Sequence, residues 1–378
     1  MKIGIITQPL ATNYGGILQN YALQKALIRL GHEVYTINRN NLPEEYISRW
    51  DKRLIFHTKQ KIKKFLRKPY RPSMAELLEI RKHCISFVKN NISTTGTFKN
   101  REELQEIIND YKFDGYIVGS DQVWRPMYSL NIYNDFLDFC QEEQGVKRIA
   151  YAASFGVKEW EFNEEESEEC SRLAKLFNAI SVREDSGIAL CKEHLYVDAT
   201  HVLDPTMLLD KENYIELAES AGETPSEGNL FCYILDNTKE IQNAVSYIEE
   251  ELSLTNFNVR AQKGGYTIKC GDDIGNYTIP SPTKWLRAFM DAKMVFTDSF
   301  HGCVFSIIFN KPFWVIGNEG RGNARFDSLL KLFNLENRKI GLKDIKNTDL
   351  TAPIDWNEVN TTRKEWQDIS LNFIKRNL

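Results

Sequence analysis

The strongest constraint on the fold of this chain is a regular alternation of short apolar segments with longer amphipathic ones. Strand-like segments are expected at residues 2–7, 33–37, 115–120, 148–154, 179–185, near 196, and at 230–236, 258–261, 293–298 and 311–317. Helix-like segments are expected at residues 17–30, 74–90 and 240–252. Strands that alternate with helices predict parallel sheets covered by helices, which is an α/β fold.

The length of the chain and one loop-like stretch suggest two domains. A chain of 378 residues can bury two separate cores. Residues 218–229 are rich in Gly, Ser, Pro and Glu, a composition typical of a surface loop or linker, and the pattern restarts after them. We expect an N-terminal domain at 1–205, a C-terminal domain at 206–350, and an amphipathic helix at 351–378 that could pack back on the N-terminal domain.

Composition excludes several classes of protein. With 42% hydrophobic and 26% charged residues, the chain is expected to fold rather than to be disordered. No apolar run has the length of a membrane span, and the first ten residues are too short an apolar run for a secretory signal. Seven cysteines without a CxxC pair predict reduced thiols in a cytoplasmic protein, and no residues show metal-ligand spacing.

Positive charge is concentrated in residues 49–71. This stretch holds ten Lys or Arg and one Asp, a net charge of +9 in a chain whose net charge is −4, so the remainder carries −13. It also contains the apolar residues Leu54, Ile55, Phe56, Ile62, Phe65 and Leu66. It could lie on an anionic membrane surface, or form a solvated helix whose apolar face packs on its own domain. Nucleic acid is disfavoured, because the acidic remainder would repel it.

Polar residues and two glycines surround the start of the first expected helix. Gly15 and Gly16 would let backbone N–H groups approach a ligand, and a helix N-terminus favours anions. Asn13, Tyr14 and Gln19 add the polar groups that a sugar site would use. The stretch is neither G-x-G-x-x-G nor a P-loop, so dinucleotide binding is not supported. The glycines could instead serve only a tight turn.

A second candidate site is VGSDQVW, residues 118–124, at the end of an expected strand. Asp121, Gln122 and Trp124 combine an acid, an amide and an indole. Such groups suit a carbohydrate, whose hydroxyls need acceptors and whose apolar face stacks on aromatic rings. The alternative is that Ser120 or Asp121 caps a helix and that Trp124 belongs to the core.

Four cationic candidates also follow expected strands. Arg183, in SVRED, either pairs with a neighbouring carboxylate or awaits an anionic ligand. His301, in TDSFHG, lies at a strand-to-helix junction and has either a ligand or a capping role. Arg321 and Arg325 lie in a glycine-rich stretch that is either an anion clamp or a solvated loop. All four can face one strongly cationic cleft, which would suit a small, densely anionic substrate.

Several stretches together resemble a known family. TNYGGILQNYAL, VGSDQVW, YAASFG, SVRED, VLDPT and TDSFHG, in this order and followed by RGNARFDSLL, resemble the polysaccharide pyruvyl transferase family. The resemblance extends to about residue 330. It implies two Rossmann-like domains facing a cleft, similar to the GT-B glycosyltransferases, with the acceptor on the N-terminal side and the donor on the C-terminal side. It also implies phosphoenolpyruvate as donor and a sugar diol as acceptor, which give a cyclic pyruvate ketal and inorganic phosphate.

The resemblance assigns roles to residues of this chain. Arg183 and His301 would bind the donor and act in catalysis. Many family members carry Arg-Leu-His where this chain has Ser299-Phe300-His301, so another arginine is expected to supply the missing charge. The expected donor-binding set is Arg183, Ser299, His301, Gly302, Arg321 and Arg325, and the expected acceptor-binding set is Asn13, Tyr14, Gly15, Gly16, Gln19, Gln122 and Trp124.

The residue types fit this chemistry. Phosphoenolpyruvate carries a carboxylate and a phosphate, which arginine binds well. His301 would act as general acid or as a cation near the phosphate, because imidazole can do either near neutral pH. Asp121 would be a base or an anchor for the acceptor hydroxyl. No metal, nucleotide or redox cofactor is required, and a lipid-linked acceptor would place residues 49–71 at the inner face of the membrane.

Two other functions compete with this interpretation. A nucleotide-sugar glycosyltransferase of the same architecture would bind UDP- or GDP-sugars and would not use phosphoenolpyruvate. A non-catalytic carbohydrate-binding protein would keep its sugar binding after loss of both Arg183 and His301.

Overall fold

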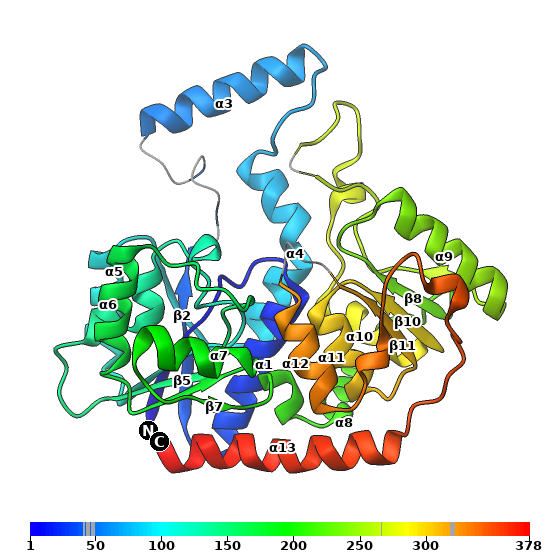
Figure 1. Ribbon diagram of the computed structural model, residues 1–378. Coiled ribbons are helices and arrows are strands. Elements are labelled where there is room, and N and C mark those ends of the chain that lie inside the picture. The colour runs from blue at the N-terminus through cyan, green and yellow to red at the C-terminus, as the bar shows by residue number, and fades with distance from the viewer. Residues whose placement is uncertain (41, 43–45, 47–49, 266, 318–321) are drawn as a thin grey trace.

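The protein is built on two parallel β-sheets with helices packed around them (Figure 1). A computed structural model describes residues 1–378 except 41, 43–45, 47–49, 266 and 318–321. The N-terminal sheet has the strand order β3-β2-β1-β4-β5-β6-β7, and the C-terminal sheet has the order β12-β11-β10-β8-β9. The first order contains the Rossmann arrangement 3-2-1-4-5-6, and the second is the flavodoxin-like 2-1-3-4-5.

The strands are short, and the residues of the central strands β1, β4, β5, β6, β8, β10 and β11 are nearly all buried, as expected of parallel sheets covered on both faces. The N-terminal sheet consists of β1 (Lys2–Ile6), β2 (Glu33–Arg39), β3 (Thr94–Phe98), β4 (Gly115–Val118), β5 (Lys147–Ala153), β6 (Ala179–Val182) and β7 (Thr200–His201). The C-terminal sheet consists of β8 (Leu230–Tyr233), β9 (Asn256–Phe257), β10 (Met294–Thr297), β11 (Phe313–Ile316) and β12 (Lys339–Ile340).

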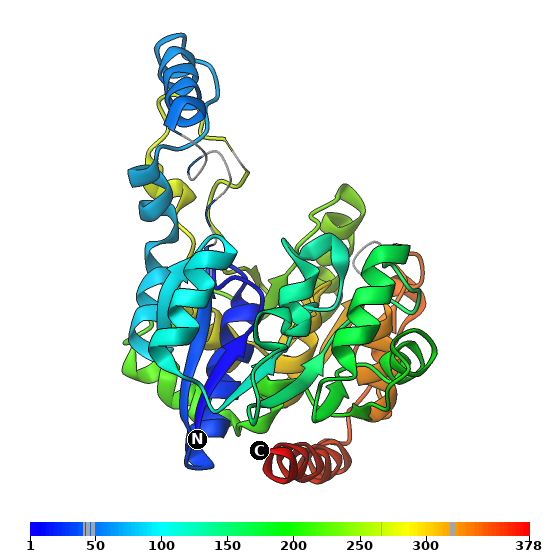
Figure 2. The ribbon, with the colours of Figure 1, turned by 90° about the vertical axis from the view of Figure 1, so that its left-hand side faces the viewer.

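Helices connect the strands and cover both sheets (Figures 1 and 2). The first half contains α1 (Tyr14–Arg29), α3 (Trp50–Phe65), α4 (Met74–Asn91), α5 (Arg101–Tyr111), α6 (Glu164–Ala174) and α7 (Ser186–Leu190). The second half contains α8 (Lys211–Ser220), α9 (Lys239–Leu252), α10 (Pro282–Asp291), α11 (Phe300–Ile308), α12 (Ala324–Leu332) and α13 (Trp356–Asn377).

Helix α1 lies between the two halves of the molecule. Thirteen of its 16 residues are buried, so it lacks the exposed polar face of a surface helix. Its Leu23 and Leu27 pack with Ile5 of β1, whereas its Tyr14 ring lies 5.7 Å from the Trp285 ring of α10. Helix α1 is therefore held by contacts with both halves, its start by the C-terminal half and its later turns by the N-terminal half.

Helix α13 leaves the C-terminal half and packs on the N-terminal half (Figure 1). The Ser370 hydroxyl accepts a hydrogen bond from the Leu203 amide at 3.0 Å, and the Gln367 amide donates to the Leu208 carbonyl at 3.0 Å. Ile374 joins the apolar cluster around β1. The boundaries at 205 and 350 stay predictions, because the largest apolar cluster contains side chains from both halves.

The structure differs from the expected strands at four places. β3 was not expected, because its sequence TTGTF is not apolar and the strand pairs only with β2 at the sheet edge. β7 lies at residues 200–201 rather than near Tyr196, whose φ of 56° is left-handed and incompatible with a strand. β9 precedes the expected segment 258–261, and the two-residue strand β12 was missed.

Candidate active site

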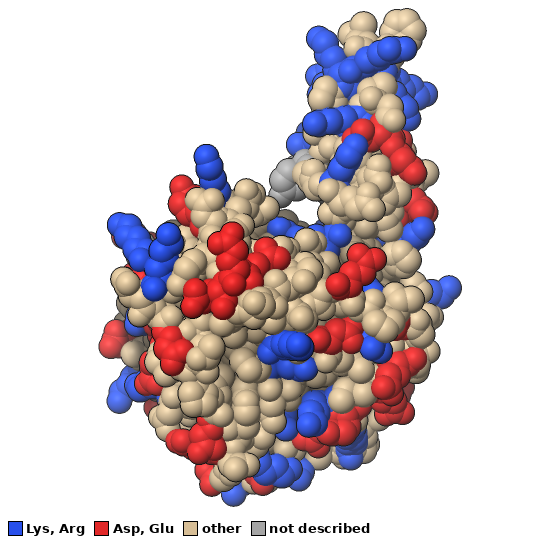
Figure 3. All heavy atoms as spheres, turned by 90° about the vertical axis from the view of Figure 1, so that its right-hand side faces the viewer, with Lys and Arg blue, Asp and Glu red and all other residues tan. Residues whose placement is uncertain are grey.

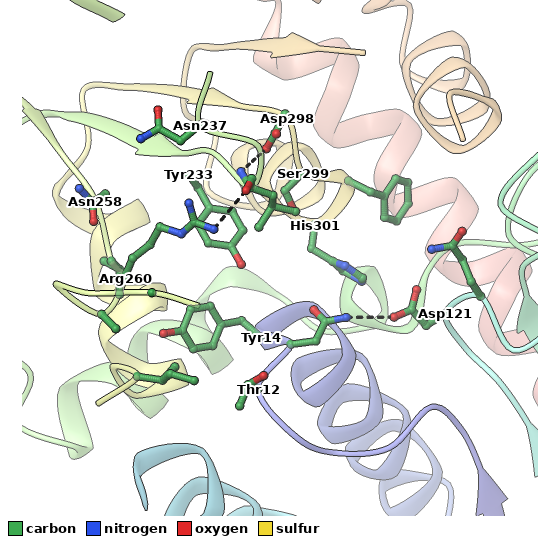
Figure 4. Close-up of a pocket in the computed structure, with 18 of the residues that line it drawn as sticks. Thr12, Tyr14, Asp121, Tyr233, Asn237, Asn258, Arg260, Asp298, Ser299 and His301 are labelled. Carbon is green, nitrogen blue, oxygen red and sulfur yellow. Dashed lines mark hydrogen bonds between the residues drawn. The ribbon is translucent and has the colours of Figure 1, made fainter. Parts of the chain in front are cut away.

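A pocket of about 1080 Å³ lies between the two sheets, at the carboxyl ends of their strands (Figure 4). One wall follows β1 and β4 and contains Asn13, Tyr14 and Asp121. The opposite wall follows β8 and β10 and contains Tyr233 and His301. The strand order reverses between β1 and β4 and again between β8 and β10. Open α/β sheets bind ligands at such switch points, so this pocket is the candidate site.

A buried cluster of Arg183, Asp121 and Asp204 lies at the N-terminal wall, and of its members only Asp121 lines the pocket. Arg183, directly after β6, donates from Nη1 to Asp204 Oδ2 at 2.9 Å and from Nη2 to Asp121 Oδ1 at 3.2 Å. The Arg183 side chain is 1% exposed and does not line the pocket. Both its terminal nitrogens donate to carboxylates, so in this structure Arg183 positions Asp121 and Asp204. Its expected role in donor binding stays a prediction.

The charges of this cluster keep both carboxylates ionised. Burial by itself raises the pKa of Asp121, but the charges of Arg183, His301 and Arg325 lower it below its ordinary value. Burial likewise raises the pKa of Asp204, while the contact with His301 and the charge of Arg183 lower it well below its ordinary value. Each carboxylate is therefore ionised and can accept a hydrogen bond at neutral pH.

Asp204 was not predicted as a site residue. It follows β7 in the sequence VLDPT, and its Oδ1 accepts hydrogen bonds from the amide and the hydroxyl of Thr206 at 3.0 and 2.7 Å. Its Oδ2 faces Arg183 and lies 3.5 Å from His301 Nε2. The available signal was an acid directly after an apolar segment, in one of the stretches that carry the family resemblance.

His301 occupies the first turn of α11 and meets the N-terminal half of the molecule. A Cβ built on Gly15 of α1 would lie 2.0 Å from His301 Nδ1, so only glycine leaves room for the imidazole there. Nε2 lies on the side of Asp204. The imidazole is thus held between the start of α1 and a carboxylate, at the N-terminal end of α11.

Arg325 supplies a cation that does line the pocket. Its guanidinium lies 5.5 Å from the centre of the Phe300 ring, and that of Arg183 lies 4.5 Å from the same ring. Burial and the like charge of Arg183 lower the pKa of Arg325 to about 10. Asp121 and Asp298 also line the pocket, so its described lining carries charges of both signs. The expected strongly cationic cleft stays a prediction, because Arg321 lies outside the described residues.

The C-terminal wall of the pocket is polar and held by a network around β8. Asp298 accepts hydrogen bonds from the Leu235 and Asp236 amides at 2.6 and 2.9 Å. Arg260 donates to the Leu235 carbonyl at 3.3 Å and is exposed at the pocket. Figure 4 shows Arg260 and Asn258 across the pocket from Asp121. Asn258 and Arg260 were missed because they lie in a loop without a recognisable motif.

Three of the expected acceptor residues line the pocket, namely Asn13, Tyr14 and Gln122. The Asn13 amide lies 3.4 Å from Asp121 Oδ2, and the Tyr14 hydroxyl donates to the Pro280 carbonyl at 2.9 Å. Tyr14 therefore ties the start of α1 to the C-terminal half.

Two other expected acceptor residues were wrong, because they belong to the interior. Gln19 is fully buried, and its amide group bonds to the Thr7 hydroxyl and the Ser120 amide. Trp124 is fully buried, donates to the Asp135 carbonyl at 2.9 Å and stacks on Phe136. The alternative interpretation of Trp124 as a core residue is the correct one.

The remaining candidates have local packing roles or lie outside the described residues. Ser299 lines the pocket and caps α11, its hydroxyl accepting from the Gly302 amide at 3.3 Å. Gly302 itself does not line the pocket; a Cβ there would lie 2.3 Å from the Thr297 hydroxyl. Gly16 packs beside Asn13. Arg321 lies outside the described residues.

Contacts between the two halves surround the site. The Asp185 amide, next to the buried cluster, donates to the Ser328 hydroxyl of α12 at 2.9 Å. A Cβ on Gly322 would lie 1.9 Å from the Gly156 carbonyl oxygen, so the loop before α12 touches the loop after β5. Within the described ranges, no group of three or more His, Cys, Asp or Glu is arranged to hold a metal ion.

Solved structures with the same fold include sugar-nucleotide enzymes. The chain resembles UDP-GlcNAc 2-epimerase from Methanocaldococcus jannaschii at 13% identity and a TM-score of 0.54, with 98% of each chain covered. It resembles the glycotransferase of kitacinnamycin at 11% identity and 0.51, with 100% and 99% covered. It resembles spinosyn forosaminyltransferase at 10% identity and 0.50, with 99% and 97% covered. At such low sequence identity the structural similarity establishes the fold alone, and it confirms the GT-B-like architecture.

A family comparison goes further. The model of the polysaccharide pyruvyl transferase family matches residues 13–320. The chain belongs to the polysaccharide pyruvyl transferase family. No curated protein sequence matches it significantly. The matched range includes both walls of the pocket, from Asn13 to His301, while Arg325 lies beyond it. Family membership supports a transferase that acts in polysaccharide pyruvylation.

Proposed function

We propose that this pyruvyl transferase uses phosphoenolpyruvate to form a cyclic pyruvate ketal on two hydroxyls of a sugar. A proton adds to the methylene carbon of the donor, and one sugar hydroxyl oxygen bonds to C2. The bond from C2 to the phosphate oxygen then breaks, and the second hydroxyl bonds to C2. The two sugar hydroxyls lose two protons in total. One of them balances the proton gained by the new methyl group, and the other leaves with phosphate. Phosphoenolpyruvate is thus a co-substrate, and no separate cofactor is needed.

Two side chains that line the pocket, one from each wall, suit the proton transfers. His301 is the proposed general acid, because imidazole can donate a proton near neutral pH. Asp121 is the proposed base for the acceptor hydroxyl, because Arg183 and Arg325 help to keep its carboxylate ionised. Asp204 is a positioning residue that orients the His301 ring from 3.5 Å.

The donor anion has a matching site beside His301. The N-termini of α1 and α11 converge on the pocket, and helix N-termini favour phosphate and carboxylate groups. Arg325 adds a buried cation at the same place, and a bound dianion would offset its repulsion from Arg183. We assign to Arg325 the charge that family members take from an arginine at the position of Ser299.

The acceptor sugar would enter beside Asn13 and Tyr14. Their side chains, with Gln122 and the exposed Arg260, provide hydrogen-bonding groups around an open volume of about 1080 Å³. This space accommodates a sugar together with the small donor. Acceptors attached to a lipid diphosphate are included in the proposal, because polymer repeat units are usually built on lipid carriers.

One observation carries the proposal: His301 lies in the pocket of a pyruvyl transferase family member, locked between Gly15 and Asp204. The test incubates the protein with phosphoenolpyruvate and a panel of free and lipid-linked galactosides and mannosides, and measures phosphate release and ketal formation. His301→Ala is expected to abolish both, while His83→Ala, an exposed position on α4, retains them.

Two outcomes would point to the competing functions. Transfer from UDP- or GDP-sugars without use of phosphoenolpyruvate would identify a glycosyltransferase. The absence of turnover of any donor by the wild type, together with sugar binding that survives the double variant Arg183→Met and His301→Ala, would identify a non-catalytic carbohydrate-binding protein.

A further inference from the structure

Helix α3 projects from the body of the molecule as an arm (Figures 1 and 2). It lies beyond the edge at which the strands of the N-terminal sheet end, and it covers neither sheet. Its inner side is anchored: the Tyr46 ring lies 5.3 Å from the Phe56 ring, and Lys64 pairs with Glu76 of α4 at 3.2 Å. These contacts fix which side of α3 faces outward.

The outward side of α3 is exposed and largely apolar, with Asp51 and Thr58 as the polar residues that helical spacing also places there. Its apolar members, here called the apolar stripe, are each more than half exposed: Leu54, Ile55, Ile62, Phe65 and Leu66. At 3.6 residues per turn these positions share about a third of the helix circumference. The interpretation that this face packs on its own domain is therefore wrong, since Phe65 alone is 86% exposed.

Lysines border the apolar stripe on both edges. By helical spacing, Lys52, Lys59 and Lys63 lie along one edge and Lys61 lies along the other, and all four are exposed. Figure 3 shows Lys and Arg crowded on the outer part of the arm, while Asp and Glu are spread over the body. An exposed apolar stripe bordered by lysines is typical of helices that lie in the interface of a membrane.

We propose that the apolar stripe inserts into the surface of an anionic lipid bilayer, with the bordering lysines on the lipid phosphates. The helix has 16 residues and a length of about 24 Å, so it is too short and too charged to span the bilayer. No helix within the described ranges is long and apolar enough to cross a membrane. Charge complementarity also sets the orientation of the protein on the bilayer. An anionic surface attracts residues 49–71, whose net charge is +9, and repels the rest of the chain, whose net charge is −13.

The arm is coupled to the wall of the pocket. Tyr70, after α3, and Ile268 exchange backbone hydrogen bonds of 3.0 and 2.8 Å. The segment 258–264, which precedes Ile268, lines the pocket. A bilayer bound at α3 would hold the pocket close to the headgroups. This last step rests on the proposed function, since it suits an acceptor sugar attached to a lipid, whereas bilayer binding itself does not depend on it.

The test measures sedimentation of the full chain with vesicles of phosphatidylglycerol and phosphatidylcholine, and with vesicles of phosphatidylcholine alone. One variant makes the stripe polar by Leu54→Ser, Ile62→Ser and Phe65→Ser. A second neutralises its borders by Lys59→Gln, Lys61→Gln and Lys63→Gln. A matched control neutralises three exposed lysines elsewhere, by Lys89→Gln, Lys99→Gln and Lys112→Gln. Circular dichroism and thermal unfolding check that each variant is folded.

The wild type and the matched control are expected to bind the anionic vesicles, and all proteins should bind the neutral ones weakly. Each neutralised border lysine should lower partitioning by about fivefold, and the serine variant should lose binding as well. Phosphoenolpyruvate binding, measured by calorimetry, should be equal in all variants, so failure of the proposed function would be seen separately.

Three results would overturn the inference. The first is anionic-vesicle binding that the serine variant keeps in full. The second is a dimer, seen by light scattering, that the serine variant dissociates while the wild type binds no vesicles. The third is binding to single-stranded RNA that depends on the border lysines and not on the stripe.

Discussion

His301 Nε2 lies 3.5 Å from Asp204 Oδ2, and the two residues follow strands of different sheets, β10 and β7. Asp204 is also bonded to Arg183, so the contact joins His301 to the buried cluster of Arg183, Asp121 and Asp204. The proposed general acid of the C-terminal half is thus oriented by a carboxylate of the N-terminal half. Activity should therefore depend on the contacts between the two halves as much as on the residues that touch the substrate.

Asp204→Asn is expected to lower kcat by about 100-fold, because the His301 ring loses the carboxylate that orients it. The KM for phosphoenolpyruvate should change little, since Asp204 does not line the pocket. Steady-state kinetics separate the two constants, and Asp204→Glu should recover part of kcat. An equal rise in KM with unchanged kcat would mean that Asp204 acts on binding instead.

Gly15→Ala is expected to lower kcat/KM by about 100-fold, because its Cβ would lie 2.0 Å from His301 Nδ1 and displace the ring. Gly16→Ala is the matched control: it makes the same change in the same helical turn, but its Cβ would lie 3.3 Å from the movable Asn13 side chain. Similar losses in the two variants would show that helix α1 itself is disturbed.

Arg183→Met should destabilise the fold by about 3–5 kcal/mol, because it leaves two buried carboxylates without their cation. Urea unfolding measures this loss. Adding Asp204→Asn to the variant should restore part of the stability by removing one of the uncompensated charges. If the double variant is less stable by the sum of the two single losses, the three groups do not act as one cluster.

Acid should weaken the same cluster. The pKa of Asp121 and that of Asp204 are lower in the folded chain than the ordinary value of about 3.9 for an unfolded chain. The stability that they contribute is therefore present above about pH 4 and is lost as the pH falls through their folded pKa values. The free energy of unfolding between pH 7 and pH 3 should fall less steeply for Asp204→Asn than for the wild type; equal slopes would contradict this.

Arg325→Met should separate ligand binding from stability. Burial and the repulsion by Arg183 disfavour the charged Arg325 side chain, so the unfolding temperature without ligand should change little or rise. Phosphoenolpyruvate should raise the unfolding temperature of the wild type and not that of the variant. An equal rise in both proteins would exclude Arg325 from the donor site.

Local sequence patterns were sufficient for the positions of many elements and for the place of His301. Parallel strands followed by helices leave their ends at one sheet edge, and β10 followed by α11 placed His301 there without further information. The same reasoning placed Asp121 after β4. The edge strand β3 was missed because its pairing with β2, and not its own composition, makes it a strand.

Partners that are distant in sequence account for most of the errors at the site. Arg183 pairs with Asp121 and Asp204, 62 and 21 residues away, and not with the neighbouring carboxylates. Gln19 and Trp124 have residue types suited to a sugar site, but only the packing of α1 and the stacking of Trp124 on Phe136 show that they are internal. A motif specifies which side chains follow a strand, whereas tertiary packing decides which of them face the pocket.

The most direct test of the central claim is to run the reaction in D2O with an acceptor sugar and to follow the product methyl group by NMR. The account predicts a pyruvate ketal whose methyl group carries one deuterium, formed together with inorganic phosphate, by the wild type and His83→Ala but not by His301→Ala. Ketal formation by His301→Ala at the wild-type rate would contradict it.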